Sequence, residues 1–278
     1  MNEVSISVPG TTANLGPGYD ALGIALDVRN KVTVREGASM AHPPIVADAA
    51  DLFFTTSGKP PFPFSWEIEG GVPRSRGMGS SVTVRLGILH ALNELTGQPL
   101  HADQLFELCA RLEGHPDNAA PAAFGGFTVA KTGAPTLRCE VDPQLAFVLL
   151  IPDFEVATPA ARAALPKTIT HRDAAASCAN ACRVTAAFTL RRYELLAGCF
   201  EDWLHQPHRL HLIPMLHDVI AAGVESGAIG GFLSGSGSTI CCVTLRDPQT
   251  VAAAMLAAAG SNARTLVTTA DNRGTFRV

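Results

Sequence analysis

A glycine-rich turn followed by two serines is the strongest chemical signal in the sequence. The segment PRSRGMGSSV, residues 73–82, follows a predicted strand and opens a predicted helix. Unpaired N–H groups and the macrodipole at a helix N-terminus favour anions, and glycines let the backbone approach phosphate oxygens closely. The segment matches neither GxxxxGK[ST] nor GxGxxG, because Val82 stands where the third glycine of the latter belongs. It predicts a phosphate site, and the alternative is an ordinary helix start after a flexible turn.

A second segment, EGHPDNAAPAAFGG at residues 113–126, brings carboxylates to the end of another predicted helix. Glu113 lies at the C-terminal end of that helix, where the helix dipole disfavours a negative charge. A bound cation would compensate, and Mg²⁺ is commonly held by one or two protein oxygens together with phosphates and water. His115, Asp117 and Asn118 follow on a tight turn. The alternatives are an exposed Glu113 and an Asp117–Asn118 pair that only caps the next short helix.

A third segment, GGFLSGSGST at residues 230–239, places small residues between two predicted strands. A loop of glycine and serine can pack its backbone against a phosphate or against another loop, or it can simply turn the chain. By itself this segment does not separate these alternatives.

Length, composition and charge narrow the class of protein that contains these segments. The chain has 278 residues, 47% of them apolar and 17% charged, with a formal net charge of −4. That length suggests one large or two modest domains with a real core, and the composition excludes a disordered chain. A pI near 6.1 and 6% aromatic residues argue against nucleic-acid and membrane partners.

The cysteines and the N-terminus indicate the compartment. Seven cysteines, an odd number without a metal-type CxxC pair, predict reduced thiols. No apolar run reaches 18 residues, and the start MNEVSISVPG has no export-signal pattern. We therefore expect a cytoplasmic protein.

Strand and helix patterns are mixed along the whole chain. Alternating apolar residues predict strands at 4–8, 22–28, 31–36, 64–70, 126–132, 136–141, 145–152 and 263–270, and a hairpin around SGSG. Helical spacing predicts helices at 82–97, 101–114, 159–165, 172–197 and 248–259, the first two ended by glycines. This mixture, without strict βαβ alternation, predicts an α+β fold with two subdomains around one cleft.

Taken together, the segments resemble a known family. VPGTTANLGPGYDALGIAL, PRSRGMGSS and GGFLSGSGST are similar, in this order, to the three motifs of the galacto-, homoserine, mevalonate and phosphomevalonate (GHMP) kinase superfamily. ANLGPGYD, EGHPDN with its following glycine pair, ATPAARAALP and HRLHLIP resemble the homoserine kinase branch. Several matches in one order are more specific than any single match.

The resemblance implies a two-part fold. A ribosomal-protein-S5-like N-terminal part would span residues 1–152, and an α/β-sandwich C-terminal part residues 153–278. It also implies an ATP- and Mg²⁺-dependent phosphotransferase that converts the hydroxyl of L-homoserine to O-phospho-L-homoserine in threonine biosynthesis, with ATP and homoserine as small-molecule partners. Members of the family are often homodimers.

The resemblance also assigns roles to residues of this sequence. The ATP phosphates would lie on Pro73, Arg76, Gly77, Met78, Gly79, Ser80, Ser81 and Gly235. Mg²⁺ would be held by Ser81 and Glu113. The amino-acid substrate would contact Asn14, Asp20, His115, Thr158, Arg162 and Arg209, and the catalytic positions would be Asn118, Glu113 and Asp117.

The chemistry of homoserine agrees with these roles. Its carboxylate needs a guanidinium, which Arg162 or Arg209 can supply, and its ammonium needs oxygens such as those of Asp20 and Asn14. Phosphoryl transfer depends mainly on alignment and charge neutralisation. We therefore expect direct in-line transfer with the hydroxyl oriented by Asn118, and Asp117 is the alternative base.

Two further alternatives stay open at the level of the sequence. One is a kinase for another small alcohol that carries a carboxylate. The other is a catalytically silent relative that binds a nucleotide or a metabolite, because the segment before Phe64 is shorter than in relatives and the adenine side has no assigned counterpart.

Overall fold

The fold is built on two antiparallel β-sheets, in a computed structural model that describes residues 2–37, 41–260 and 262–278. The first sheet contains β1 (Glu3–Ala13), β2 (Leu22–Glu36), β3 (Phe64–Gly70), β4 (Phe127–Val129), β5 (Leu137–Cys139) and β10 (Phe276–Arg277). Its order is β10-β1-β2-β4-β5, with β3 also paired to β2. The second contains β6 (Ala146–Pro152), β7 (Gly230–Leu233), β8 (Ile240–Thr244) and β9 (Ala263–Thr268) in the order β7-β8-β6-β9.

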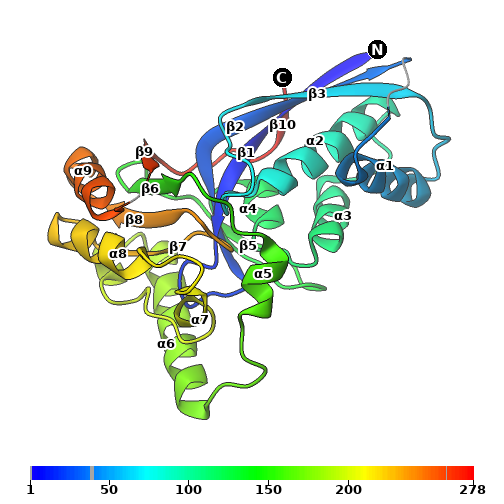
Figure 1. Cartoon of the computed structure of the whole chain (residues 1–278). Coiled ribbons are helices and arrows are strands. Elements are labelled where there is room, and N and C mark those ends of the chain that lie inside the picture. The colour runs from blue at the N-terminus through cyan, green and yellow to red at the C-terminus, as the bar shows by residue number, and fades with distance from the viewer. Residues whose placement is uncertain (1, 38–40, 261) are drawn as a thin grey trace.

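Four helices cover the first sheet, in the right-hand part of Figure 1. They are α1 (Pro44–Ser57), α2 (Ser80–Leu95), α3 (Ala102–Glu113) and α4 (Ala119–Phe124). The apolar face of α2, with Leu86 and Leu89, packs with Phe53 of α1 on the strand residues Val4 and Val32. Burying such side chains contributes about 1.5–3 kcal/mol each. This packing holds α2 rigidly, and its N-terminus is the predicted phosphate site.

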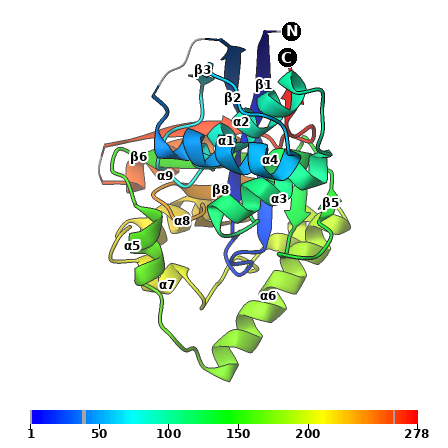
Figure 2. The same cartoon turned by 90° about the vertical axis from the view of Figure 1, so that its right-hand side faces the viewer.

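The second sheet has helices on both of its faces. They include α5 (Thr158–Ala163), α6 (His171–Thr189), a 3-10 turn η1 (Tyr193–Leu196), α7 (Gln206–Arg209), α8 (Leu216–Glu225) and α9 (Pro248–Ala258). Helices α8 and α9 cover one face, whereas α6 extends from the other (Figures 1 and 2). Phe188 of α6 stacks on Phe127 of β4 at 4.5 Å between ring centroids, in a core shared with Phe147 of β6. The two sheets therefore form one body.

The antiparallel sheets with their helices confirm the predicted α+β class, and the hairpin β7–β8 around SGSG is also confirmed. All seven cysteines are free thiols, as predicted. The strands expected at 22–28 and 31–36 are one strand, β2, because the pairing with β1 continues past a register shift at Pro9 and Gly10.

The helix expected at 172–197 was wrong in its length. It ends at Thr189, and Arg191 then takes a left-handed backbone with φ of 54°. Tyr193 is buried and its hydroxyl accepts a hydrogen bond from the backbone N–H of Asp142. Packing of this tyrosine against Phe188 turns the chain back onto the core, which helical spacing alone does not reveal.

Sheet membership also bears on the expected division at residue 152. Strand β6 lies before that boundary but pairs only with β8 and β9 of the second sheet among the described strands. Strand β10, at the C-terminal end, returns to pair with β1. The two sheets therefore divide the chain between β5 and β6, except that β10 belongs to the first sheet.

Candidate active site

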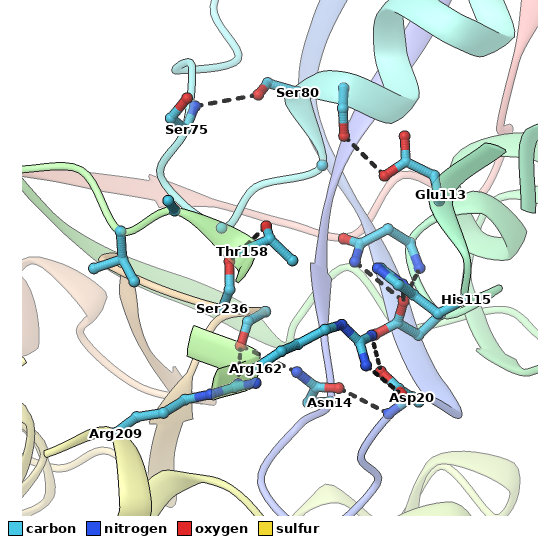
Figure 3. A pocket seen from close by; sticks show the side chains of 18 of the residues that line it. Asn14, Asp20, Ser75, Ser80, Glu113, His115, Thr158, Arg162, Arg209 and Ser236 are labelled. Carbon is cyan, nitrogen blue, oxygen red and sulfur yellow. Dashed lines mark hydrogen bonds and ion pairs between the residues drawn. The ribbon is translucent and has the colours of Figure 1, made fainter. Parts of the chain in front are cut away.

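A cavity of about 350 Å³ lies where the two sheets meet. Its walls come from the β1–β2 loop, the start of α2, the turn between α3 and α4, the segment from residue 155 to α5, α7, and the β7–β8 loop (Figure 3). Most of the predicted site residues line it: Asn14, Asp20, Gly77, Gly79, Ser80, Ser81, Glu113, His115, Asp117, Asn118, Thr158, Arg162, Arg209 and Gly235. The structure thus brings segments from residue 14 to residue 236 to one space.

The N-terminus of α2 forms one end of the cavity. Gly79 is the residue before the helix, with φ of 66°, and no side chain caps the helix start. The first N–H groups of α2 are therefore free to bind an anion. A Cβ atom at Gly77 would lie 2.2 Å from the carbonyl oxygen of Ser234, and one at Gly79 would lie 2.2 Å from Oγ1 of Thr11. Only glycine fits both positions, because the turn is packed against two other loops.

Three residues predicted to touch phosphates do not line the cavity: Pro73, Arg76 and Met78. The Met78 side chain is fully buried in the core between the sheets. The Arg76 guanidinium donates hydrogen bonds to the carbonyls of Pro152 and Asp153, at 2.9 and 2.6 Å. The side chains of Arg76 and Met78 therefore anchor the turn to its surroundings, and a phosphate contact of these three residues stays a prediction.

Glu113 and Ser81 meet beside the helix start. Ser81 Oγ donates a hydrogen bond of 2.9 Å to Glu113 Oε2, and Arg85 forms an ion pair with the other carboxylate oxygen. A hydroxyl and a carboxylate are the hard oxygen donors that suit Mg²⁺. Arg85 was missed in the sequence, although it lies one helical turn after Ser81 and so on the same face.

Asn118 is oriented from both sides of its amide. Its Oδ1 accepts a hydrogen bond of 2.7 Å from Oγ1 of Thr11, and its Nδ2 donates to Asp117 Oδ1 at 3.2 Å. The same Asp117 oxygen accepts from the Asn118 backbone N–H and pairs with Nδ1 of His115. Asp117 is 2% exposed. The Asp117 carboxylate therefore orients the turn and, together with Thr11, fixes the direction of the Asn118 side-chain amide.

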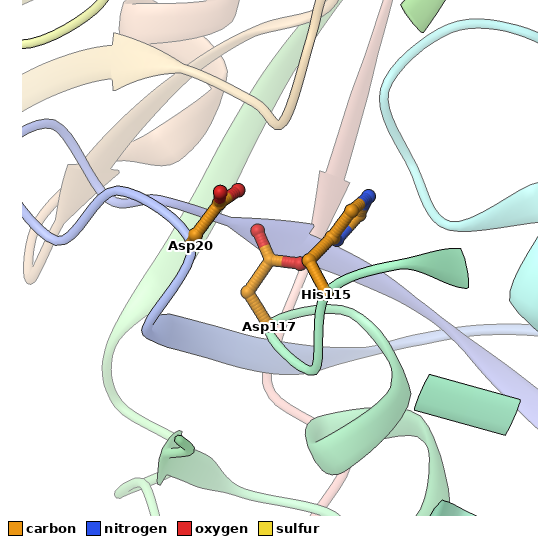
Figure 4. A group of neighbouring side chains, drawn as sticks. All are labelled: Asp20, His115 and Asp117. Carbon is orange, nitrogen blue, oxygen red and sulfur yellow. The ribbon is translucent and has the colours of Figure 1, made fainter. Parts of the chain in front are cut away.

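Asp20, His115 and Asp117 gather on one wall, with their ligand atoms within 4.8 Å of one another (Figure 4). Burial opposes protonation of His115, but the hydrogen bond and charge of Asp117, with Asp20, outweigh it and raise the pKa of His115. Arg162 donates two hydrogen bonds to the Asp20 carboxylate, at 2.9 and 3.2 Å. The wall therefore places two carboxylates beside one guanidinium, and carboxylate oxygens suit a cationic group of a ligand.

Arg209 closes the opposite side and is 2% exposed. Its Nε donates to the carbonyl of Ala161, and its Nη1 to the carbonyl of Gly235, both at 3.1 Å. Gly235 O also accepts from Nδ2 of Asn14 at 3.0 Å. Gly235, predicted on the phosphate side, thus contacts two residues predicted for the amino-acid substrate.

Sequence reasoning missed several lining residues, among them Tyr19, Ser75, Glu155 and Ser236. Tyr19 lies inside the quoted PGYD motif, next to Asp20, and its ring is 5.5 Å from the Arg209 guanidinium. Ser236 Oγ lies 3.4 Å from Oγ1 of Thr158. Position within the motifs was the available signal for Tyr19 and Ser236.

Helix α1 occupies the segment before Phe64 for which no counterpart was assigned. Its buried residues, such as Val46 and Phe53, pack into the core of the first sheet. None of its residues lines the described cavity. No helix among the described residues combines the length and the apolar character that crossing a bilayer requires.

Known proteins match the chain over both parts. The family model for the GHMP kinase N-terminal domain matches residues 44–126, and the model for the GHMP kinase C-terminal domain matches residues 185–262. The homoserine kinase of Gloeobacter violaceus is 39% identical over 262 residues, 87% of this chain and 88% of that protein. The homoserine kinase of Thermus thermophilus is 36% identical, with 96% of both chains covered.

Solved structures agree with these matches. The crystal structure of homoserine kinase from Cytophaga hutchinsonii has a TM-score of 0.89 at 26% identity, and covers 100% of this chain and 98% of that one. A mevalonate kinase with a TM-score of 0.73 at 14% identity, covering 97% of this chain and 100% of its own, shares the fold. The fold is that of a GHMP kinase. The chain belongs to the homoserine kinases within that family.

Proposed function

We propose that this chain transfers the γ-phosphoryl group of ATP to the hydroxyl of L-homoserine, which yields O-phospho-L-homoserine and ADP. The observation that carries the proposal is one cavity with an uncapped helix N-terminus at one end and paired acidic and guanidinium groups at the other. The first suits a polyphosphate, and the second suits the zwitterion of an amino acid. A role in threonine biosynthesis follows from that product.

The phosphate end supports ATP binding through backbone groups. The N–H groups at the start of α2 would donate hydrogen bonds to phosphate oxygens, and Gly77 and Gly79 keep the turn open to them. Ser81 and Glu113 would hold Mg²⁺, which neutralises charge on the transferred phosphoryl group. Arg85 holds Glu113 in place from its other oxygen.

The amino-acid end supports a carboxylate on one side and an ammonium on the other. Arg209 and Arg162 would bind the carboxylate, and Asp20 with Asn14 would bind the ammonium. Asp20 and Arg162 pair with each other in this structure. A zwitterion can replace that pair by giving each residue a new partner, whereas a ligand with one charge leaves the other residue unpaired. This exchange favours amino acids over simple alcohols.

The hydroxyl would be oriented by Asn118, whose amide is held by Thr11 and Asp117. Alignment and charge neutralisation then drive in-line transfer. The Asp117 oxygen nearest to Asn118 already receives its donors from the turn, so we assign Asp117 to orientation and leave the proton to solvent. Cytoplasmic location and a homodimer stay predictions from the sequence.

The test is ADP release with Mg-ATP and purified protein, with homoserine, 4-hydroxybutanoate, 3-aminopropanol, mevalonate and galactose as acceptors. We expect turnover with homoserine and phosphohomoserine as the product by ³¹P NMR. Equal turnover with 4-hydroxybutanoate would instead support a kinase for another carboxylate-bearing alcohol. ATP binding without ADP release on any acceptor would identify a silent relative.

A further inference from the structure

Arg209 is held in the cavity wall by an unusual set of partners. The side chain is almost completely buried, and burial is the main cause that lowers its pKa. A guanidinium has five N–H donors. Three of them are used, by the carbonyls of Ala161 and Gly235 and by Nδ1 of His205, each at 3.1 Å. Nη2 carries the other two donors, and Arg209 and Tyr19 both line the cavity, with the Tyr19 ring 5.5 Å from the guanidinium.

The hydrogen bond to His205 fixes the state of that imidazole. Arginine can only donate, so Nδ1 of His205 must accept and cannot carry a proton. The proton of the neutral ring is then on Nε2, which donates to the carbonyl of Gly16 at 2.8 Å. The two hydrogen bonds are consistent with one tautomer only, and a protonated ring would repel Arg209.

The charged groups around His205 do not reverse this state. Burial lowers the pKa of His205 most strongly. Asp202, whose Oδ2 lies 3.4 Å from Nε2, raises it, Arg209 lowers it, and the Gly16 carbonyl and Asp20 raise it by less, so the pKa is lowered to about 4. Asp202 is itself occupied, because its carboxylate accepts the backbone N–H groups of Leu204, His205 and Gln206 at 2.6–3.0 Å. It therefore fixes the start of α7, the helix that carries Arg209.

Gly16 connects this arrangement to the opposite wall of the cavity. It lies in the β1–β2 loop between Asn14 and Asp20, with φ of 72°. A Cβ atom there would be 2.3 Å from the carbonyl oxygen of Phe200, so the loop is packed directly on the segment that leads to α7. The Tyr19 ring, in the same loop, lies 5.2 Å from the His205 ring.

We infer that His205 is a positioning residue that holds Arg209 in register with the β1–β2 loop, and so sets the distance between the carboxylate-binding and ammonium-binding walls. The inference rests on the proposed binding of the homoserine carboxylate by Arg209. It assigns a role to a histidine that does not line the cavity.

The test compares His205→Asn with Arg209→Gln and with the double variant, and His208→Asn on the same helix serves as the matched control. We expect His205→Asn to raise KM for homoserine about tenfold, with kcat and KM for ATP nearly unchanged. In the Arg209→Gln background the same substitution should have no further effect on kcat/KM for homoserine. His208→Asn should behave as the wild type.

The outcomes separate the inference from the function it rests on. If the effects of His205→Asn and Arg209→Gln multiply, His205 does not act through Arg209 and the inference is overturned. If Arg209→Gln alone leaves KM for homoserine unchanged, the carboxylate role of Arg209 fails and the inference fails with it. ¹⁵N NMR of histidine-labelled wild-type protein gives an independent reading, which requires no variant to fold. It should show His205 neutral with the proton on Nε2 from pH 5 to 8, and a protonated ring or the other tautomer contradicts the inference.

Discussion

The two ends of the cavity recognise charge in different ways. At the phosphate end, the groups offered to the ligand are mostly backbone N–H groups at the start of α2, exposed by a turn that needs glycine at Gly77 and Gly79. At the amino-acid end they are side chains, Asp20, Arg162 and Arg209, which come from three separate segments. The backbone end depends on the shape of one short turn, whereas the side-chain end depends on the assembly of the whole fold.

The largest effect is expected from a change of shape at the phosphate end. Gly77→Ala places a Cβ atom 2.2 Å from the Ser234 carbonyl oxygen at a φ of 73°. The turn must shift, and we expect kcat/KM for ATP to fall about 10³-fold in steady-state kinetics.

Gly97→Ala is the matched control, because Gly97 also has a positive φ, 83°, but no atom lies within 4 Å of its added Cβ. It should lower stability by about 1 kcal/mol and leave the kinetics unchanged. Equal kinetic losses in both variants would mean that close packing at Gly77 is unimportant.

Asn118 lies between the two ends, and its loss should affect turnover more than binding. Without its amide the acceptor hydroxyl loses its orientation, so we expect Asn118→Ala to lower kcat about 10²-fold with little change in KM for ATP. Rapid-quench measurement of phosphohomoserine formation checks this at the chemical step. Near-normal turnover would show that the hydroxyl is oriented by another group.

A single charge at the amino-acid end should have a smaller and more selective effect. Asp20→Asn removes the partner of the ammonium, and we expect KM for homoserine to rise about 30-fold. The low turnover of 4-hydroxybutanoate, which lacks the ammonium, should not fall. Asp27→Asn, on the exposed part of β2 outside the cavity, is the control. A parallel loss with both acceptors would place Asp20 in a structural role.

The smallest expected effect concerns the proton on His115. Burial lowers the pKa of His115, but the hydrogen bond and charge of Asp117 outweigh burial, so the pKa is raised. The stability from this proton is present below the unfolded pKa of about 6.5 and is lost as pH rises through the folded value. Asp117→Asn should therefore lower the pKa of His115, measured by NMR titration, while the resonances of exposed His171 stay the same. An unchanged His115 titration would assign the shift to other neighbours.

Prediction from sequence succeeded best where residues close in the chain act together. Helices ending at Gly97 and Gly114 were expected at nearly the observed positions, because apolar spacing and a glycine terminator are local signals. The length of α6 was overestimated, since Tyr193 is drawn into the core by Phe188 and Asp142. Nothing in the spacing of that helix encodes this contact.

The same limit applied inside the site. Met78 and Arg76 belong to the phosphate motif by position, but tertiary contacts direct Met78 into the core and Arg76 to the carbonyls of β6 and its following turn. The position of Gly235 in a glycine-serine loop did not reveal that its carbonyl would meet Asn14 and Arg209.

Adjacent residues are enough to predict the glycine turn at the start of α2 and the chemical types of the groups proposed to bind substrate, because a helix start with glycines and a pair of serines is a local feature. The pairing of Asp20 with Arg162, and the contacts of Arg209 with His205 and Gly235, are visible only in the folded chain. The physical reason is that these contacts join segments far apart in the chain or depend on burial, and a buried charge finds its partners only when the surrounding segments have packed.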